Sequence, residues 1–193
     1  MSSDISQKHI EGNADGKGCA TDGTNCTTDG ISVVKQEAQA CPVALFAGTF
    51  DPLTNGHKSI IDRSLGIFGE VIVAIGVNPG KHSMFTAQQR EEYIKKVYEG
   101  NPRVKVLCYD GLTTDLAVQM GARVLIRGVR SVKDFEYERD LADINRRISG
   151  IDTMLFFTDA EQSAVSSSLV RELISYGKDV SEFVPMPLPA IIH

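Results

Sequence analysis

The residues of this chain that are best suited to chemistry stand in the segment GTFDPLTNGH at positions 48–57. Gly48 allows a ligand to approach the backbone closely, and Thr49 offers a hydroxyl beside it. His57 falls in the first turn of an expected helix, where free backbone N–H groups and the helix dipole attract anions. This combination is typical of a site that binds a nucleotide phosphate.

Two apolar runs must position this segment. The run 43–47 precedes it and has the composition of a buried strand, whereas the residues after it place Ile60, Ile61 and Leu65 at helical spacing. The segment is therefore expected to be a strand-to-helix turn at the carboxyl end of a strand. Open α/β sheets bind their ligands at that edge.

Polar groups suited to phosphate follow two later strands as well. Lys81 stands in a Pro-Gly turn after the apolar run 71–77, where it is either a solvated loop residue or a mobile cation facing the first motif. Ser166, Ser167 and Ser168 precede an apolar helix, where hydroxyls cap the helix or bind phosphate. These two uses are compatible, so the cap does not exclude a ligand.

Two arginines surround a glycine after the apolar run 124–126. Arg127 and Arg130 are spaced i, i+3, so they can reach one anion from two sides, and arginine suits bidentate phosphate contact. A purely structural Arg127 directly after an apolar strand would be costly to desolvate, which favours a functional role. The alternative is pairing with nearby acidic side chains, namely Asp134, Glu136 and Glu138.

The elements that carry these motifs alternate between strand and helix. Strands are predicted at 43–47, 71–77, 104–108, 124–126 and 154–157. Helices are predicted at 56–68, 86–98, 114–120, 134–148 and 167–176. This alternation predicts an α/β fold, a doubly wound, Rossmann-like parallel five-stranded sheet with flanking helices. Right-handed crossovers would bring all strand ends with polar motifs to one edge.

Composition limits the class of protein. The chain has 193 residues, which fits one folded domain at 42–193. Residues 1–41 are poor in large apolar groups and are predicted to be a disordered N-terminal extension. They carry an imperfect seven-residue Asp-Gly repeat; calcium binding there is the weaker alternative, because known calcium-binding repeats have other periods and more carboxylates.

Charge and cysteine content point to a small-molecule ligand. A net charge of −5 disfavours binding to a nucleic-acid polymer, and the chain has no long apolar run for a membrane. The four cysteines show no zinc spacing and are expected to be reduced thiols. The N-terminus lacks the pattern of a signal peptide, so we expect a cytoplasmic protein.

The motifs together resemble the phosphopantetheine adenylyltransferase family, within the nucleotidyltransferase superfamily that carries a T/HxGH signature. The resemblance spans about residues 43–185 and includes five motifs in family order. They are GTFDPLTNGH, the turn 79–81 with MFT at 84–86, LIRGVR at 125–130, DFEYE at 134–138 and SSSLV at 166–170.

The resemblance implies transfer of AMP from ATP to 4′-phosphopantetheine, giving dephospho-coenzyme A and pyrophosphate. It also implies Mg²⁺ with the ATP, a homohexamer, and coenzyme A as feedback inhibitor. The residues implied to hold 4′-phosphopantetheine are Thr49, Lys81, Thr113 and Arg127. Those implied to hold ATP are Gly48, Thr49, Phe50, His57, Arg130, Glu138, Ser166, Ser167 and Ser168. The catalytic residues would be His57 and Lys81, with no protein ligand to the metal.

The chain departs from the family pattern at two positions. Gln162 stands where many relatives have an aromatic residue near the adenine, four positions before the serine run. Thr113 stands where many have a bulky apolar residue. These differences concern the adenine pocket and the pantetheine arm.

No residue pattern predicts a protein nucleophile, and none is needed, because the substrate phosphate can attack the α-phosphorus itself. His57, Lys81 and the helix N-terminus are then the expected donors to the developing charge. The sequence leaves open whether His57 is neutral or protonated. Alternative functions are a cytidylyltransferase, a nicotinamide mononucleotide adenylyltransferase, and a catalytically silent nucleotide sensor.

Overall fold

A computed structural model describes residues 42–78, 80 and 82–191. The expected N-terminal extension with its Asp-Gly repeat lies outside the described residues, and so does Lys81. Within the described part of the chain, no helix is both long enough and apolar enough to span a membrane.

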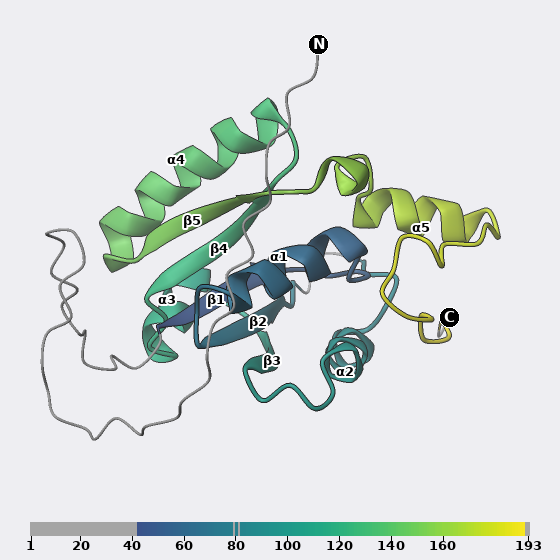
Figure 1. Ribbon diagram of the computed structural model, residues 1–193, viewed down its shortest axis with the longest axis horizontal. Coiled ribbons are helices and arrows are strands. Elements are labelled where there is room, and N and C mark those ends of the chain that lie inside the picture. Colours follow the sequence, from purple (N-terminus) through teal and green to yellow (C-terminus); the bar gives the residue numbers. More distant parts are fainter. Residues whose placement is uncertain (1–41, 79, 81, 192–193) are drawn as a thin grey trace, which may run out of the picture. The chain divides into compact units, whose positions relative to one another are not determined.

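The sheet has five parallel strands in the order β3-β2-β1-β4-β5 (Figure 1). The strands are β1 Val43–Gly48, β2 Glu70–Gly76, β3 Val104–Tyr109, β4 Val124–Val129 and β5 Asp152–Phe157. The chain adds strands on one side of β1 and then on the other, so loops leaving β1 and β4 diverge. The predicted doubly wound fold is confirmed, and a crevice is expected at that switch point.

Helices follow each strand and cover both faces of the sheet. They are α1 Asn55–Leu65, α2 Ala87–Val97, α3 Thr113–Gln119, α4 Val132–Ser149 and α5 Ser167–Ser175, with a 3-10 turn Ala160–Gln162 after β5. Each lies at a position predicted from the sequence, although α4 begins two residues before the expected start. The reason is that Ser131 caps it, accepting a hydrogen bond from the backbone N–H of Asp134.

Two apolar layers hold the sheet between its helices. On β1, Ala44 and Phe46 face the layer that contains α1 and α2, whereas Leu45 and Ala47 face the layer that contains α3. This alternation is the period of two expected for a strand that is buried on both faces. The sheet edge that carries the motifs is thus held rigidly from both sides.

The extent of β4 corrects one prediction. The sequence placed Arg127 after the strand, but β4 continues through Val129. The reason is parallel pairing with β5, which joins Arg127 to Leu155 and Val129 to Phe157. Arg127 therefore points from a strand rather than from a flexible loop.

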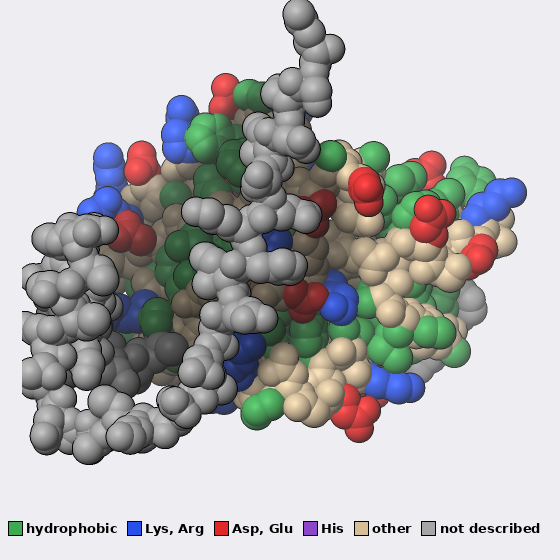
Figure 2. All heavy atoms as spheres, in the orientation of Figure 1, with side chains coloured by type: hydrophobic (Ala, Val, Ile, Leu, Met, Phe, Trp, Pro, Cys, Tyr) green, Lys and Arg blue, Asp and Glu red, His purple; other side chains and the backbone are tan. Residues whose placement is uncertain are grey.

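The surface bears charges of both signs. Lysine, arginine, aspartate and glutamate side chains are interspersed over the visible face (Figure 2), and the net charge of the whole chain is −5.

Candidate active site

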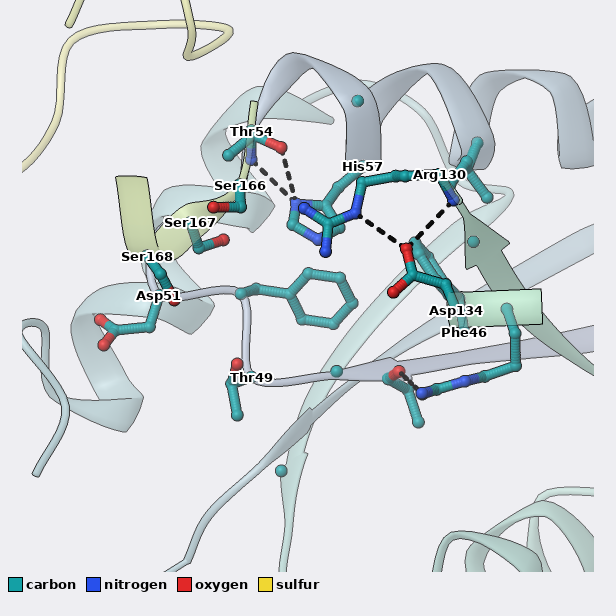
Figure 3. Close-up of a pocket in the computed structure, with 18 of the residues that line it drawn as sticks. Phe46, Thr49, Asp51, Thr54, His57, Arg130, Asp134, Ser166, Ser167 and Ser168 are labelled. Carbon is teal, nitrogen blue, oxygen red and sulfur yellow. Dashed lines mark hydrogen bonds and ion pairs between the residues drawn. The ribbon is translucent and has the colours of Figure 1, made fainter. Parts of the chain in front are cut away.

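A pocket of about 670 Å³ lies at the carboxyl edge of the sheet. Loops that follow β1 and β4 form its walls, together with the first turns of α1 and α5 (Figure 3). Every site residue that was predicted from the sequence and that the structure describes lines this pocket. They are Gly48, Thr49, Phe50, His57, Thr113, Arg127, Arg130, Glu138, Ser166, Ser167 and Ser168.

The loop after β1 is shaped around Phe50. Phe50 has a φ of 48°, which is uncommon for a residue with a side chain, and this turn folds its ring back over Gly48. A Cβ at Gly48 would lie 3.0 Å from the ring, so a larger residue there would have to displace the ring. The ring is 2% exposed and meets the imidazole of His57 edge-on, with the ring centroids 5.2 Å apart. The ring of Phe50 thus supports His57.

His57 is held in a single orientation by the start of α1. Its Nδ1 accepts a hydrogen bond from the backbone N–H of Thr54 at 3.1 Å and lies 2.9 Å from the Thr54 hydroxyl. A ring nitrogen that accepts from a backbone N–H carries no proton, so the neutral ring carries its proton on Nε2. Burial, together with the nearby Arg130 guanidinium, lowers the pKa of His57 to about 4. The lowered pKa and the contact at Nδ1 both favour a neutral His57 whose proton is on Nε2, a question that the sequence left open.

Arg130 supplies positive charge beside this histidine. Its side chain extends from the end of β4 toward the imidazole (Figure 3). Its Nε lies 3.4 Å from a carboxylate oxygen of Asp134, and both side chains are more than 30% exposed. So long and exposed an ion pair contributes little to stability. Arg130 is consequently available to an anion in the pocket.

Arg127 is bound far more tightly than Arg130. Its Nε and Nη2 donate to both carboxylate oxygens of Glu138, at 2.7 and 2.6 Å, and its Nη1 donates to the Ala47 carbonyl at 3.0 Å. Glu138 is only 7% exposed. Pairing with an acidic neighbour, which the sequence kept as an alternative, is therefore present. Three of the five guanidinium donors are used, so two remain for a ligand.

The serine run caps α5 and still presents donors to the pocket. The Ser166 hydroxyl accepts from the N–H of Leu169, and the Ser168 hydroxyl accepts from Arg171. The Ser167 hydroxyl donates to the Pro52 carbonyl. Because a hydroxyl both donates and accepts, Ser166 and Ser168 each keep an O–H for a ligand. Capping and anion binding are compatible in this geometry.

Both departures from the family pattern have an identifiable environment. The Thr113 hydroxyl lies 2.7 Å from the hydroxyl of Tyr109, and both residues line the pocket. Gln162 lies in the 3-10 turn after β5, against Gly56 of α1. Its buried Oε1 has no hydrogen-bond partner among the described residues.

Sequence reasoning missed several residues that line the pocket, among them Asp51, Thr54 and Arg171. A threonine three residues before His57 matches the spacing of a capping box, so that signal was available. Arg171 follows Ser168 at i+3 on one helix face, which also allowed contact between them. Asp51 gave no local signal, because its side-chain partners are 33 and 34 residues away.

Protein ligands alone do not form a metal site here. Within residues 42–78, 80 and 82–191, no three His, Cys, Asp or Glu side chains are grouped so that they could hold a metal ion.

Comparison with known proteins gives the family. Residues 45–173 match a family model described as cytidylyltransferase-like. A phosphopantetheine adenylyltransferase of Porphyromonas gingivalis is 57% identical over 143 residues, which are 74% of this chain and 94% of that protein. The phosphopantetheine adenylyltransferase of Bacteroides thetaiotaomicron is 51% identical over 142 residues, again 74% and 94% of the two chains.

Solved structures confirm the fold. A putative nicotinate-nucleotide adenylyltransferase from Vibrio parahaemolyticus superposes with a TM-score of 0.55 at 19% identity, covering 75% of this chain and 93% of that chain. A bifunctional NMN adenylyltransferase/ADP ribose pyrophosphatase from Francisella tularensis, complexed with AMP and a manganese ion, gives 0.58 at 14%, covering 78% and 46%. At these identities the likeness concerns the fold alone.

Proposed function

The chain belongs to the phosphopantetheine adenylyltransferase family, and we propose how its pocket residues share the work of that reaction. The enzyme transfers AMP from ATP to 4′-phosphopantetheine and produces dephospho-coenzyme A and pyrophosphate, a step of coenzyme A biosynthesis. The observation that carries the proposal is the neutral His57, fixed as an Nε2 donor beside the guanidinium of Arg130 in the pocket.

The substrate phosphate is the nucleophile in this proposal. Cys108, the one cysteine within the described residues, does not line the pocket, and burial raises the pKa of its thiol. The Thr54 hydroxyl does contact His57, but Thr54 is only 2% exposed and serves the helix start. A phosphate oxygen of 4′-phosphopantetheine therefore attacks the α-phosphorus of ATP, a P–O bond forms, and pyrophosphate leaves with the bonding electrons.

Catalysis then depends on position and charge. Negative charge develops on the oxygens of the α-phosphate during transfer, and His57 Nε2–H and Arg130, which both line the pocket, would compensate it. A neutral histidine needs no proton from solvent to act in this way. Its orientation is set by contacts within the protein, namely those with Thr54 and Phe50. Preorganised donors of this kind act on the transition state more than on bound ATP.

The two substrates occupy different sides of the pocket in this proposal. Figure 3 shows His57, Arg130 and the serine run on one side, with Thr49 set apart from them. ATP would be held by the first group and by Gly48. The phosphate of 4′-phosphopantetheine would be held by Thr49 and by the two unused donors of Arg127, while its arm would pass Thr113. Lys81 keeps its proposed role at the same phosphate, although it lies outside the described residues.

The remaining proposals concern partners and assembly. Mg²⁺ would be bound by ATP oxygens, since the described residues do not form a metal site. Coenzyme A would inhibit, because it carries an adenine nucleotide and a pantetheine arm that fit the same two sides. Exposed apolar side chains on α4, namely Tyr137, Ile144 and Ile148, support self-association into the expected hexamer. A cytoplasmic location is also proposed.

A substrate comparison tests the proposed function. Pyrophosphate release is measured with ATP or CTP, and with 4′-phosphopantetheine, nicotinamide mononucleotide or glycerol phosphate as acceptor. We expect release only with ATP and 4′-phosphopantetheine. Activity with another pair would assign the chain to a different nucleotidyltransferase reaction, and no release with any pair would indicate a nucleotide sensor.

A further inference from the structure

Asp51 is a buried carboxylate to which the transfer reaction above gives no task. It lies in the loop after β1, lines the pocket, and is 4% exposed. Burial of a charged group is costly unless that group is well hydrogen-bonded. The contacts of Asp51 therefore show what its charge does in this protein.

Both carboxylate oxygens of Asp51 bind the segment that leads into α2. Oδ2 accepts from the backbone N–H of Met84 and Oδ1 from that of Phe85, each at 2.9 Å. The two oxygens of one side chain thus accept from two consecutive backbone amides. A carboxylate suits this pair because neither of its oxygens carries a hydrogen that would face an N–H. The loop after β1 and the segment before α2 are thereby fixed to each other.

The same residue is also tied to α5. Arg171 donates through Nη1 to the backbone carbonyl of Asp51 at 2.5 Å, and this Nη1 lies 3.8 Å from the carboxylate. Its Nη2 donates to the hydroxyl of Ser168 at 3.0 Å. One arginine thus connects Asp51 to the serine run at the start of α5, on the side where ATP is proposed to bind.

A second connection runs through Arg90 on α2. This arginine is 5% exposed, and it donates to the carbonyl of Thr49 at 2.6 Å and to that of Phe85 at 3.1 Å. Thr49 and Asp51 are therefore both bound to the segment before α2. Three chain segments that surround the pocket therefore meet around Asp51, which uses its carboxylate for the segment before α2 and its backbone carbonyl for Arg171 of α5.

We propose that Asp51 is a positioning residue that sets the separation of the two substrate-binding sides of the pocket. Its carboxylate holds Met84 and Phe85, in the segment that Arg90 ties to Thr49 on the 4′-phosphopantetheine side. Its backbone carbonyl holds Arg171, which contacts the serine run on the ATP side. This inference rests on the proposed function, since it assumes that two substrates must meet in line. Misplacement of reacting groups by about 1 Å can lower a rate about 10²-fold.

The test replaces Asp51 by asparagine. Asp51→Asn keeps the size of the side chain but turns one acceptor into a donor that faces a backbone N–H. We expect kcat to fall about 10- to 100-fold, while the dissociation constants of ATP and 4′-phosphopantetheine, each measured alone, change less than about threefold. The matched control is Asp179→Asn, which also removes a carboxylate from a backbone N–H but lies on the surface outside the pocket.

Stability is measured on the same preparations. If Asp51 is only structural, Asp51→Asn melts earlier but its folded fraction keeps a normal kcat, and the proposal is overturned. Should Asp51→Asn not fold, a second variant, Arg171→Met, is used. It removes the contacts of Arg171 with Asp51 and Ser168, and the Arg171 side chain is partly exposed. We then expect the same selective fall in kcat, partly recovered in Arg171→Lys; an unchanged kcat in Arg171→Met overturns the proposal. A wild-type enzyme without activity on 4′-phosphopantetheine would instead refute the proposed function, so the two failures are distinguishable.

Discussion

Replacing His57 by alanine should separate two roles that the structure gives to the two nitrogens of one ring. Nδ1 accepts the backbone N–H of Thr54, whereas Nε2 has no hydrogen-bond partner among the described residues and is left for the substrate. The first contact belongs to the start of α1 and affects folding. The N–H donor at Nε2 is proposed to act on the transition state. His57→Ala removes both, and each loss has its own observable.

The size of each effect follows from the contact that is lost. Loss of a helix-capping contact costs about 0.5–2 kcal/mol. For a chain of this length, this corresponds to a fall of about 1–8 °C in melting temperature, at about 2–4 °C per kcal/mol. Loss of one donor to a developing oxyanion typically lowers kcat by about 10²–10³, or roughly 3–4 kcal/mol. The capping loss is too small to explain a kinetic loss of that size.

The chain offers a matched control in α2. Gln89 holds the same N3 position in a capping box with Thr86, and it accepts the Thr86 backbone N–H at 2.9 Å outside the active-site pocket. Gln89→Ala should lower the melting temperature by a similar amount with normal turnover. Pyrophosphate release and thermal melting are measured on the same preparations of both variants. The reasoning is refuted if His57→Ala melts early but keeps kcat within about threefold of wild type.

Three further predictions concern charge in the pocket. The pKa of His57 is lowered to about 4 in the folded chain from an ordinary 6.5, so between these values the unfolded chain binds one more proton than the folded chain. The free energy of unfolding should therefore decrease as pH falls from 6.5 to 4. Chemical denaturation should show a smaller decrease in His57→Ala. Replacing Arg130 by methionine removes a charge that lowers this pKa, so NMR titration should give His57 a higher pKa, and calorimetry should show weaker ATP binding; an unchanged pKa would contradict the placement of Arg130. Arg127→Lys keeps the charge but loses the planar fork that binds Glu138, together with the two N–H donors that remain for a ligand. Calorimetry should therefore show weaker 4′-phosphopantetheine binding with ATP binding little changed. A larger effect on ATP would reassign Arg127.

The fold was predictable because its signals are local and repeated. Apolar runs such as that before Gly48 alternate with helices of amphipathic spacing, and this alternation defines a parallel sheet whose carboxyl edge carries the motifs. The end of β4 was not predictable in the same way. Arg127 looks like a loop residue in sequence, and only its pairing with Leu155 of the neighbouring strand extends the strand past it.

The site was predictable as a set of residues but not as a set of contacts. Chemistry and spacing identified His57 and the two arginines. However, the tautomer of His57 depends on the backbone of Thr54, and the pairing of Arg127 depends on where α4 places Glu138. Asp51 shows the limit most clearly. Its partners come from separate segments that only the folded chain brings together, so no spacing in the sequence reveals its role.

The stereochemical course at the α-phosphorus tests the central claim most directly. The enzyme is given 4′-phosphopantetheine and ATP that carries sulfur at the α-phosphate in one known configuration, and the configuration of the thio-substituted product is determined. Direct in-line attack by the substrate phosphate predicts inversion at the α-phosphorus. Retention would require two displacements and a covalent adenylyl-protein intermediate, for example on a pocket hydroxyl such as that of Thr54 beside His57, and would contradict a mechanism based on position and charge alone.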